Sequence, residues 1–152
     1  MHIPNVRGLG ENLDFSWECG TRRAQFLFGF TEPWLLDTPT SLSFRVYKLN
    51  QQYLNSFDFK RNSVSLRVGR RLQKPSNTTV SLGYELRDER YADFSPGYDQ
   101  TDASFSPRTT SSFELTTRRD TRDLPDFPTS GSVLSYSPEL ASSFIAGDTD
   151  FH

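Results

Sequence analysis

The sequence predicts an all-β fold: an antiparallel up-and-down meander of about seven strands that forms part of a transmembrane β-barrel. Three observations lead to it. Short segments alternate between apolar and polar residues, the joints between segments differ systematically in length, and hydrophobic residues make up only 34% of the 152-residue chain although aromatics reach 14%. Successive side chains of a strand point to opposite sides, so each segment has an apolar and a polar side. The polar side is too charged for a packed core and suits a water-filled lumen, with lipid on the other side.

Seven segments carry this alternation, and each is expected to form one strand. They are Asn12–Cys19, Arg23–Phe30, Thr40–Tyr47, Asn62–Gly69, Thr78–Arg87, Thr110–Arg118 and Gly131–Ser137. The apolar side carries Leu13, Phe15, Trp17, Cys19, Phe26, Phe28, Phe30, Leu42, Phe44, Val46, Val64, Leu66, Val68, Val80, Leu82, Tyr84, Leu86, Phe113, Leu115, Leu134 and Tyr136. The polar side carries Asp14, Ser16, Glu18, Arg23, Gln25, Ser41, Ser43, Arg45, Ser65, Arg67, Ser81, Glu85, Arg87, Ser112, Glu114 and Arg118. With their flanks, several segments approach the length of about 9 to 11 residues that crosses a bilayer in a tilted barrel.

The joints between these strands predict which end of the sheet faces the periplasm. Long polar joints, Lys48–Arg61 and Asp88–Thr109, follow the third and fifth strands, whereas Arg70–Asn77 and Arg119–Ser130 are shorter. Membrane barrels have short periplasmic turns and longer outer loops. The joints after the second, fourth and sixth strands are therefore expected on the periplasmic side, although the first outer joint, of residues 20–22, is also short.

Composition and charge exclude several classes of protein. The mean hydropathy is −0.62, and no apolar run approaches the roughly 18 residues of a membrane-spanning helix. A net charge of −2 gives no electrostatic reason to bind nucleic acid. Cys19 is the single cysteine, so no intrachain disulfide is possible, and it is read as a small apolar residue. The start of the chain lacks a signal peptide, which predicts a piece of a longer protein or an internal start codon.

No catalytic, metal or cofactor site is predicted. The two histidines, His2 and His152, lie at opposite ends and outside the predicted strands, so they assemble no nucleophilic triad. The carboxylates Glu85 and Glu114 are expected to pair with Arg67, Arg87 or Arg118 along the polar wall. No glycine-rich phosphate loop follows a strand and opens a helix. The chain is therefore not expected to be an enzyme.

Two joints combine residues that suit strand ends. The joint after the second strand contains Thr31, Glu32, Pro33, Trp34, Asp37 and Pro39, and the joint before the last strand contains Asp120, Arg122, Asp123, Phe127, Pro128, Thr129 and Gly131. Proline cannot donate to a strand ladder, and tryptophan suits the lipid–water interface. Gly131 permits a positive φ before the last strand. Arg122, among three aspartates, is expected either to hold the turn through charge-assisted hydrogen bonds or to stay solvated.

In their order and spacing these two turns resemble the barrel of the BamA-like outer-membrane protein assembly factors, the bacterial surface antigen family. The lead-in of residues 5–13 and the tail, Glu139–Ala141 followed by Gly147 and Asp148, are also similar to that family. The resemblance implies a barrel of about sixteen strands in the bacterial outer membrane, preceded by periplasmic POTRA domains and using no cofactor. Its implied partners are outer-membrane lipid, unfolded outer-membrane proteins and assembly-complex lipoproteins.

On this reading, residues 1–152 are one partial barrel domain that lacks the POTRA domains, the first strands and the C-terminal strands. The motif residues are expected to be structural. Seven strands leave two open edges, so the chain alone is not expected to close into a stable barrel. The alternatives are a passive outer-membrane pore, a two-partner secretion transporter or, less favoured, a soluble β-sandwich binding module.

Overall fold

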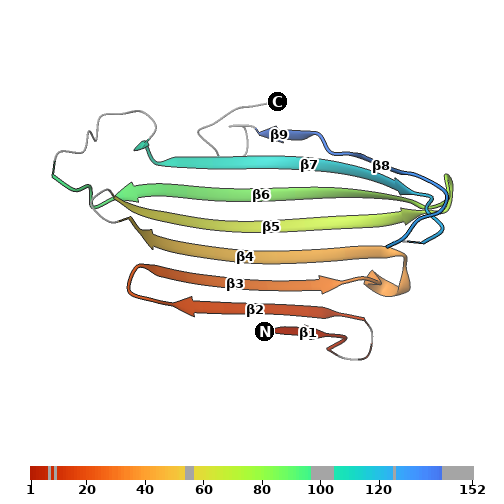
Figure 1. Cartoon of the computed structure of the whole chain (residues 1–152), viewed down its shortest axis with the longest axis horizontal. Coiled ribbons are helices and arrows are strands. Elements are labelled where there is room, and N and C mark those ends of the chain that lie inside the picture. The colour runs from red at the N-terminus through yellow and green to blue at the C-terminus, as the bar shows by residue number, and fades with distance from the viewer. Residues whose placement is uncertain (7, 9, 54–56, 97–104, 125, 142–152) are drawn as a thin grey trace.

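The structure, a computed structural model, describes residues 1–152 except 7, 9, 54–56, 97–104, 125 and 142–152. Nine strands of the described residues form one antiparallel sheet in which chain neighbours pair from β1 to β8, and β9 also pairs with β7 (Figure 1). The elements are β1 (His2–Pro4), β2 (Asn12–Cys19), β3 (Arg23–Glu32), the 3₁₀ turn η1 (Leu35–Asp37), β4 (Thr40–Gln52), β5 (Asp58–Leu72), β6 (Thr78–Ala92), β7 (Arg108–Asp120), β8 (Val133–Tyr136) and β9 (Glu139–Ala141). The predicted all-β antiparallel meander is therefore confirmed.

The central strands are longer than the alternation predicted. β5 and β6 each contain 15 residues, and the joints predicted at Lys48–Arg61 and Asp88–Thr109 shrink to residues 53–57 and 93–107. The sequence placed these strand ends where the apolar alternation stops. Backbone pairing continues beyond that point, because a strand that emerges into water can carry polar side chains on both sides.

The sheet also contains short strands that the sequence did not predict. β1 pairs residues 2–4 with 12–14, and a strand of three residues is too short to show alternation. The predicted last strand, Gly131–Ser137, begins instead at Val133. Beyond Pro138, which has no N–H to donate, β9 resumes the pairing with β7. β8 and β9 thus act as one interrupted edge strand, while Gly147 and Asp148 of the predicted tail lie outside the described residues.

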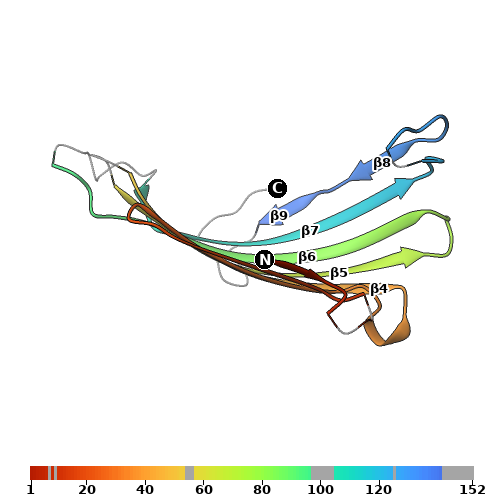
Figure 2. The same cartoon turned by 60° about the horizontal axis from the view of Figure 1, so that its bottom comes forward.

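The sheet is a single layer, and Figure 2 shows it as one curved sheet with both faces open. Among the described residues, buried apolar side chains are confined to Leu49, Phe59 and Ala141. Large apolar side chains at mid-strand are exposed, including Leu82 at 52%. No second layer of described residues packs on the sheet, as a β-sandwich would require. The apolar face therefore has to be covered by something other than a core of these residues.

The pairing register gathers the apolar residues into continuous rows across the sheet. One row reads Leu13, Phe30, Phe44, Leu66, Tyr84 and Phe113, from β2 to β7. The row beside it on the opposite side reads Asp14, Gly29, Arg45, Ser65, Glu85 and Ser112. The predicted division into an apolar and a polar side is thus continuous over six strands.

Candidate functional site

The polar side of the sheet forms a wall with a shallow depression over the middle of the strands. Its lining includes Asp14 and Gly29 together with Arg45, Glu85 and Glu114. Charged side chains of both signs come from six different strands here, and water can reach them from the open side. The sequence predicted this polar wall but not how its charges are arranged.

An ion pair crosses three strands of the wall. Arg67 on β5, Gly83 on β6 and Glu114 on β7 lie in one row. The Arg67 guanidinium donates to Glu114, and its Nη1 also donates to Thr116 Oγ1 at 3.4 Å. It passes directly over Gly83, where an added Cβ would lie 3.5 Å from the Arg67 Cζ. Glycine at this position therefore leaves the space in which the side chain crosses the strand.

The predicted pairing of the wall carboxylates is confirmed. Glu114 pairs with Arg67, and Glu85 pairs with Arg87 at 3.1 Å on its own strand. Farther along the wall, Arg61 and Glu89 pair at 2.7 Å. The sequence left the partners open, because the pairing of Glu114 with Arg67 depends on the register between strands. The role of Gly83 was missed for the same reason.

An aromatic cluster lies on the polar side at the end with the long joints. Phe59 and Tyr91 come from β5 and β6, with ring centroids 5.2 Å apart. Phe57 and Phe105 come from the two joints, and the Phe57 ring lies 5.4 Å from Tyr91 and 5.2 Å from Phe105. These contacts connect the two joints to each other and to the wall. The aromatic residues of the two joints are the signal in the sequence from which this cluster could have been predicted.

The first motif turn, Thr31–Pro39, is held mainly by backbone and short polar contacts. Thr31 and Ser43 hydroxyls lie 3.1 Å apart, Glu32 accepts from the Trp34 backbone N–H at 3.0 Å, and Asp37 ends η1 with φ of 57°. Pro33 packs against the β1–β2 turn, since a Cβ on Gly10 would lie 3.2 Å from it. The Pro39 carbonyl accepts from the Arg71 N–H at 3.0 Å.

In this turn Trp34 is 55% exposed, as an interfacial side chain would be. Its environment therefore fits the predicted place at the lipid–water interface, which remains an expectation. Leu36, two residues farther along in η1, is also exposed.

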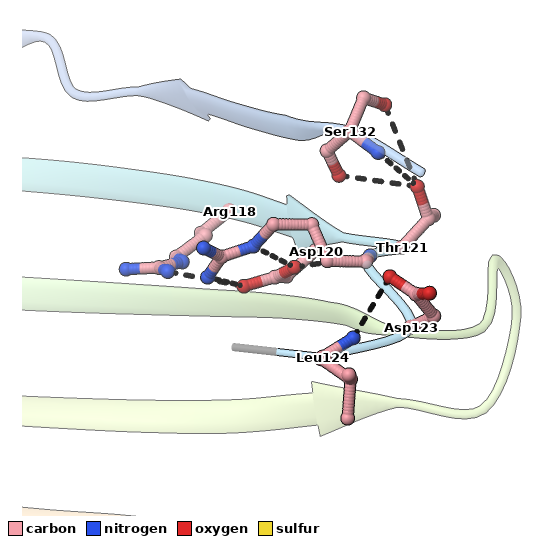
Figure 3. Close-up of polar contacts among 7 residues, drawn as sticks. Arg118, Asp120, Thr121, Asp123, Leu124 and Ser132 are labelled. Carbon is pink, nitrogen blue, oxygen red and sulfur yellow. Dashed lines mark hydrogen bonds and ion pairs between the residues drawn. The ribbon is translucent and has the colours of Figure 1, made fainter. Parts of the chain in front are cut away.

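The second motif turn, Asp120–Gly131, opens with a fork of arginines on one carboxylate (Figure 3). Asp120 accepts from Arg122 Nε at 3.0 Å and Nη2 at 2.8 Å, and from Arg118 Nη2 at 3.1 Å. Of the two readings that the sequence left open, the structure shows the hydrogen-bonded one. The Asp120 backbone N–H also donates to Asn77 in the β5–β6 turn at 3.0 Å. Two turns at the same end of the sheet are joined in this way.

Asp123 and Gly131 close the second turn. Asp123 accepts from the Thr129 hydroxyl and from the backbone N–H groups of Leu124, Thr129 and Ser130 at 2.9, 3.0 and 3.2 Å. These hydrogen bonds, that of the Thr129 hydroxyl first, lower the pKa of the Asp123 carboxyl from 3.8 to about 2. Gly131 has the positive φ that the sequence predicted, +94°. An added Cβ there would lie 2.2 Å from the Thr121 carbonyl oxygen.

The two motif turns lie at the same end of the sheet, one after β3 and the other after β7. Phe127 is 84% exposed, and Pro128 beside it is also exposed. The motif residues therefore form two separate turns at the ends of β3 and β7, rather than one combined site.

The described residues contain no group of three or more His, Cys, Asp or Glu side chains placed to hold a metal ion. Their helical residues include no segment long and apolar enough to cross a membrane. His2, predicted to lie outside any strand, is part of β1 and contacts Asp14 at 2.5 Å. His152 lies outside the described residues.

A one-sided apolar meander with a charged wall on its other face and short turns at one end defines a wall of an outer-membrane type of β-barrel. The family model of the Omp85 superfamily domain matches residues 5–152, and the chain belongs to the Omp85 superfamily. This family serves the insertion or transport of proteins at the outer membrane. The resemblance predicted from the two turns is thereby confirmed.

A solved structure shows the same fold. The chain is similar to BamA from Haemophilus ducreyi lacking POTRA domains 1-3, with a TM-score of 0.67 and 15% sequence identity over 97% of this chain. The chain spans 31% of the length of that structure. A search of the curated proteins found no match.

Proposed function

We propose that this chain is part of the barrel of a BamA-like factor that assembles and inserts other outer-membrane proteins. In this proposal residues 1–152 are one section of a longer protein, with POTRA domains and further strands outside it, and they reside in the bacterial outer membrane. The partners are outer-membrane lipid, unfolded outer-membrane proteins and the lipoproteins of an assembly complex. No cofactor and no catalytic residue take part.

The observation that carries the proposal is the one-sided sheet combined with the two motif turns at its short-joint end. Exposed apolar rows suit lipid, and the ion-paired wall suits a lumen. Both sheet edges leave backbone groups of β1 and β8 without a neighbouring strand in the described residues. In lipid each unpaired group costs several kcal/mol, so further strands are needed to complete the barrel.

Within the barrel, these strands supply a stable section rather than a moving part. The turn Asp120–Gly131 is held by a dense set of hydrogen bonds, and Arg67 connects three strands of the wall. A section of this kind keeps the register and curvature of the barrel while substrates are handled elsewhere. The motif residues act through these turn contacts.

Two other functions share this fold and make different predictions. A passive pore would conduct small solutes through the polar wall. A two-partner secretion transporter would export a single dedicated partner, whereas an assembly factor would serve many outer-membrane proteins.

Depletion of the full-length protein in its own bacterium tests the proposal. An assembly factor should be essential, and its loss should lower the amounts of many folded outer-membrane barrels, measured by heat-modifiable mobility and by quantitative proteomics of the outer membrane. A barrel with its motif turns intact should restore them, and one with Gly131→Val should restore them less.

Other outcomes would contradict the assembly function. Loss of one secreted protein with unchanged outer-membrane barrels would indicate a dedicated transporter. Loss of solute uptake alone, together with steady conductance of the purified protein in planar bilayers, would indicate a pore.

A further inference from the structure

Two arginine pairs lie near the ends of alternate strands at the short-joint end of the sheet, on the right in Figure 1. Arg70 and Arg71 precede Leu72, the last residue of β5, and Arg118 and Arg119 precede Asp120, the last residue of β7. Successive residues along a strand point to opposite sides of the sheet. Arg70 and Arg119 therefore lie on the apolar face. Arg71 and Arg118 lie on the polar wall. The same sequence pair thus places one guanidinium on each side of the sheet.

Three acidic side chains at this end, those of Asp120, Asp123 and Glu32, are engaged within their own turns. Asp120 accepts from Arg118 and Arg122, and Asp123 is held within its own turn. Glu32 accepts from the Trp34 backbone. Arg70 and Arg119 are exposed, and neither forms an ion pair with any residue in the described part of the chain.

The surroundings of the two arginines are amphipathic. Arg70 pairs with Val80, which pairs with Thr117, while Arg119 lies two residues farther along β7. The Cα atoms of the two arginines are separated by two strand spacings across the sheet and by two residues along the strand direction, which gives a distance of about 12 Å. Toward the middle of the strands the next row contains Val68, Leu82 and Leu115, all at least 41% exposed. Tyr136, beside Thr117, is also exposed.

We infer that Arg70 and Arg119 bind the headgroup of an anionic phospholipid of the periplasmic leaflet. The inference rests on the proposed membrane barrel and deepens it. The two guanidinium groups flank one phosphate from either side, and the acyl chains lie over Val80, Leu82 and Leu115. Tyr136 lies at the level of the headgroup, where its ring is buried in lipid and its hydroxyl meets water.

Charge and surface chemistry select this occupant over a protein. Guanidinium groups bind phosphate oxygens with paired N–H donors, and cations next to an apolar surface match a headgroup joined to acyl chains. At the opposite end of the same face, the cations of the described residues are Lys48, Lys60 and Arg90. Arg90 is the arginine among them, and it pairs with Asp88 at 3.0 Å. The short-joint end therefore differs in offering two guanidinium groups without an ion pair to any described residue, the group that binds phosphate through paired N–H donors.

Native mass spectrometry of the full-length protein that contains this chain tests the inference. The folded protein in detergent is titrated with phosphatidylglycerol or with phosphatidylcholine of the same acyl chains. Phosphatidylglycerol should bind more tightly. For Arg70→Gln/Arg119→Gln its affinity should fall about five-fold for each arginine removed, which corresponds to about 1 kcal/mol per interfacial basic residue. The affinity for phosphatidylcholine should not change.

The control removes the same charge from the other face. Arg45→Gln/Arg71→Gln changes two polar-side arginines that likewise form no ion pair with described residues, and it should bind phosphatidylglycerol as the parent does. Arg70→Lys/Arg119→Lys should retain most of the preference and provides a second readout if the glutamine variant folds poorly. Heat-modifiable mobility reports the folding of every variant.

Several results would overturn the lipid site. One is an equal loss of affinity for phosphatidylglycerol in both double glutamine variants, and another is a parent protein that does not prefer phosphatidylglycerol over phosphatidylcholine. A third is displacement of phosphatidylglycerol by excess glycerol 3-phosphate, which would indicate a site for free phosphate. The depletion experiment tests the assembly function separately from the lipid site. If only the assembly function were wrong, depletion would leave the other outer-membrane barrels unchanged, and the purified protein would still prefer phosphatidylglycerol.

Discussion

The two faces of the sheet use the same backbone but opposite chemistry. On the apolar face the mid-strand side chains are exposed or half-buried and make few directed contacts, apart from ring pairs such as Phe15 and Phe26 at 5.7 Å. On the polar face, arginines and carboxylates pair within and across strands. The apolar face depends on the surrounding solvent for its stability, whereas the polar face is stabilised by its own network of ion pairs.

The two faces therefore tolerate substitutions differently. A charge added to the apolar face has no partner and must be taken into lipid. A charge added to the polar face meets water and mixed charges. Substitutions matched in size but placed on opposite faces therefore measure the solvent of each face.

The largest effect is expected for Phe28→Arg, in the middle of β3 on the apolar face. In the membrane-inserted full-length parent it should cost roughly 2–4 kcal/mol, the cost of an arginine near the bilayer midplane. Urea unfolding in phospholipid vesicles measures it, with Phe28→Leu as the control. A loss below about 0.5 kcal/mol would contradict the assignment of this face to lipid.

A smaller effect is expected for the ion pair over Gly83. Arg67 and Glu114 are partly exposed, so their coupling energy in a double-mutant cycle with Arg67→Gln and Glu114→Gln should be about 0.2–1 kcal/mol. In a Gly83→Val background the coupling should approach zero, because the added side chain occupies the space that Arg67 crosses. A coupling that survives this substitution would show that the glycine is not needed.

A still smaller effect is expected for Ser81→Arg on the polar face of β6. Because this side chain faces water, the substitution should change the free energy of unfolding by less than about 0.5 kcal/mol. It is measured under the same conditions as Phe28→Arg. Equal costs for the two arginines would overturn the division into a lipid face and a water face.

The smallest effect is local to the water-exposed turn at Asp123. Its pKa is lowered from 3.8 to about 2, so the charged form is favoured in the folded turn. The linked stabilisation is complete above about pH 4 and is lost as the pH falls through about 2. The Thr129 amide, which donates to this carboxylate, should shift with a midpoint near pH 2 in NMR spectra. Asp123→Asn should abolish that titration, and a midpoint near 4 would contradict the turn contacts.

Much of the fold could be predicted, because alternation is a local property of the chain. The apolar side of β3, for example, is evident from Phe26, Phe28 and Phe30 without reference to any other strand. β1 and β9, with three residues each, are too short to show a period. The extension of β4 to Gln52 was missed because it lies beyond the apolar band, where polarity no longer reports strand structure.

The site was predictable to the same degree. Gly131 could be assigned a positive φ from its place before a strand, and Arg122 could be placed near aspartates. Which aspartate it contacts, Asp120, depends on how the turn folds. The crossing of Gly83 by Arg67 and the aromatic cluster around Phe57 join residues far apart in the chain, so they follow only from the register.

The row of Arg67, Gly83 and Glu114 also carries information that the alternation lacks. A strand that slips by one residue exposes its wrong side, but a slip of two residues keeps every apolar side chain in lipid. The alternation therefore cannot distinguish pairing registers that differ by an even number of residues. If β7 slipped by two residues, Ser112 or Thr116 would stand opposite Gly83 in place of Glu114, and Arg67 would lose its carboxylate. The ion pair thus distinguishes alignments that the hydrophobic pattern treats as equivalent.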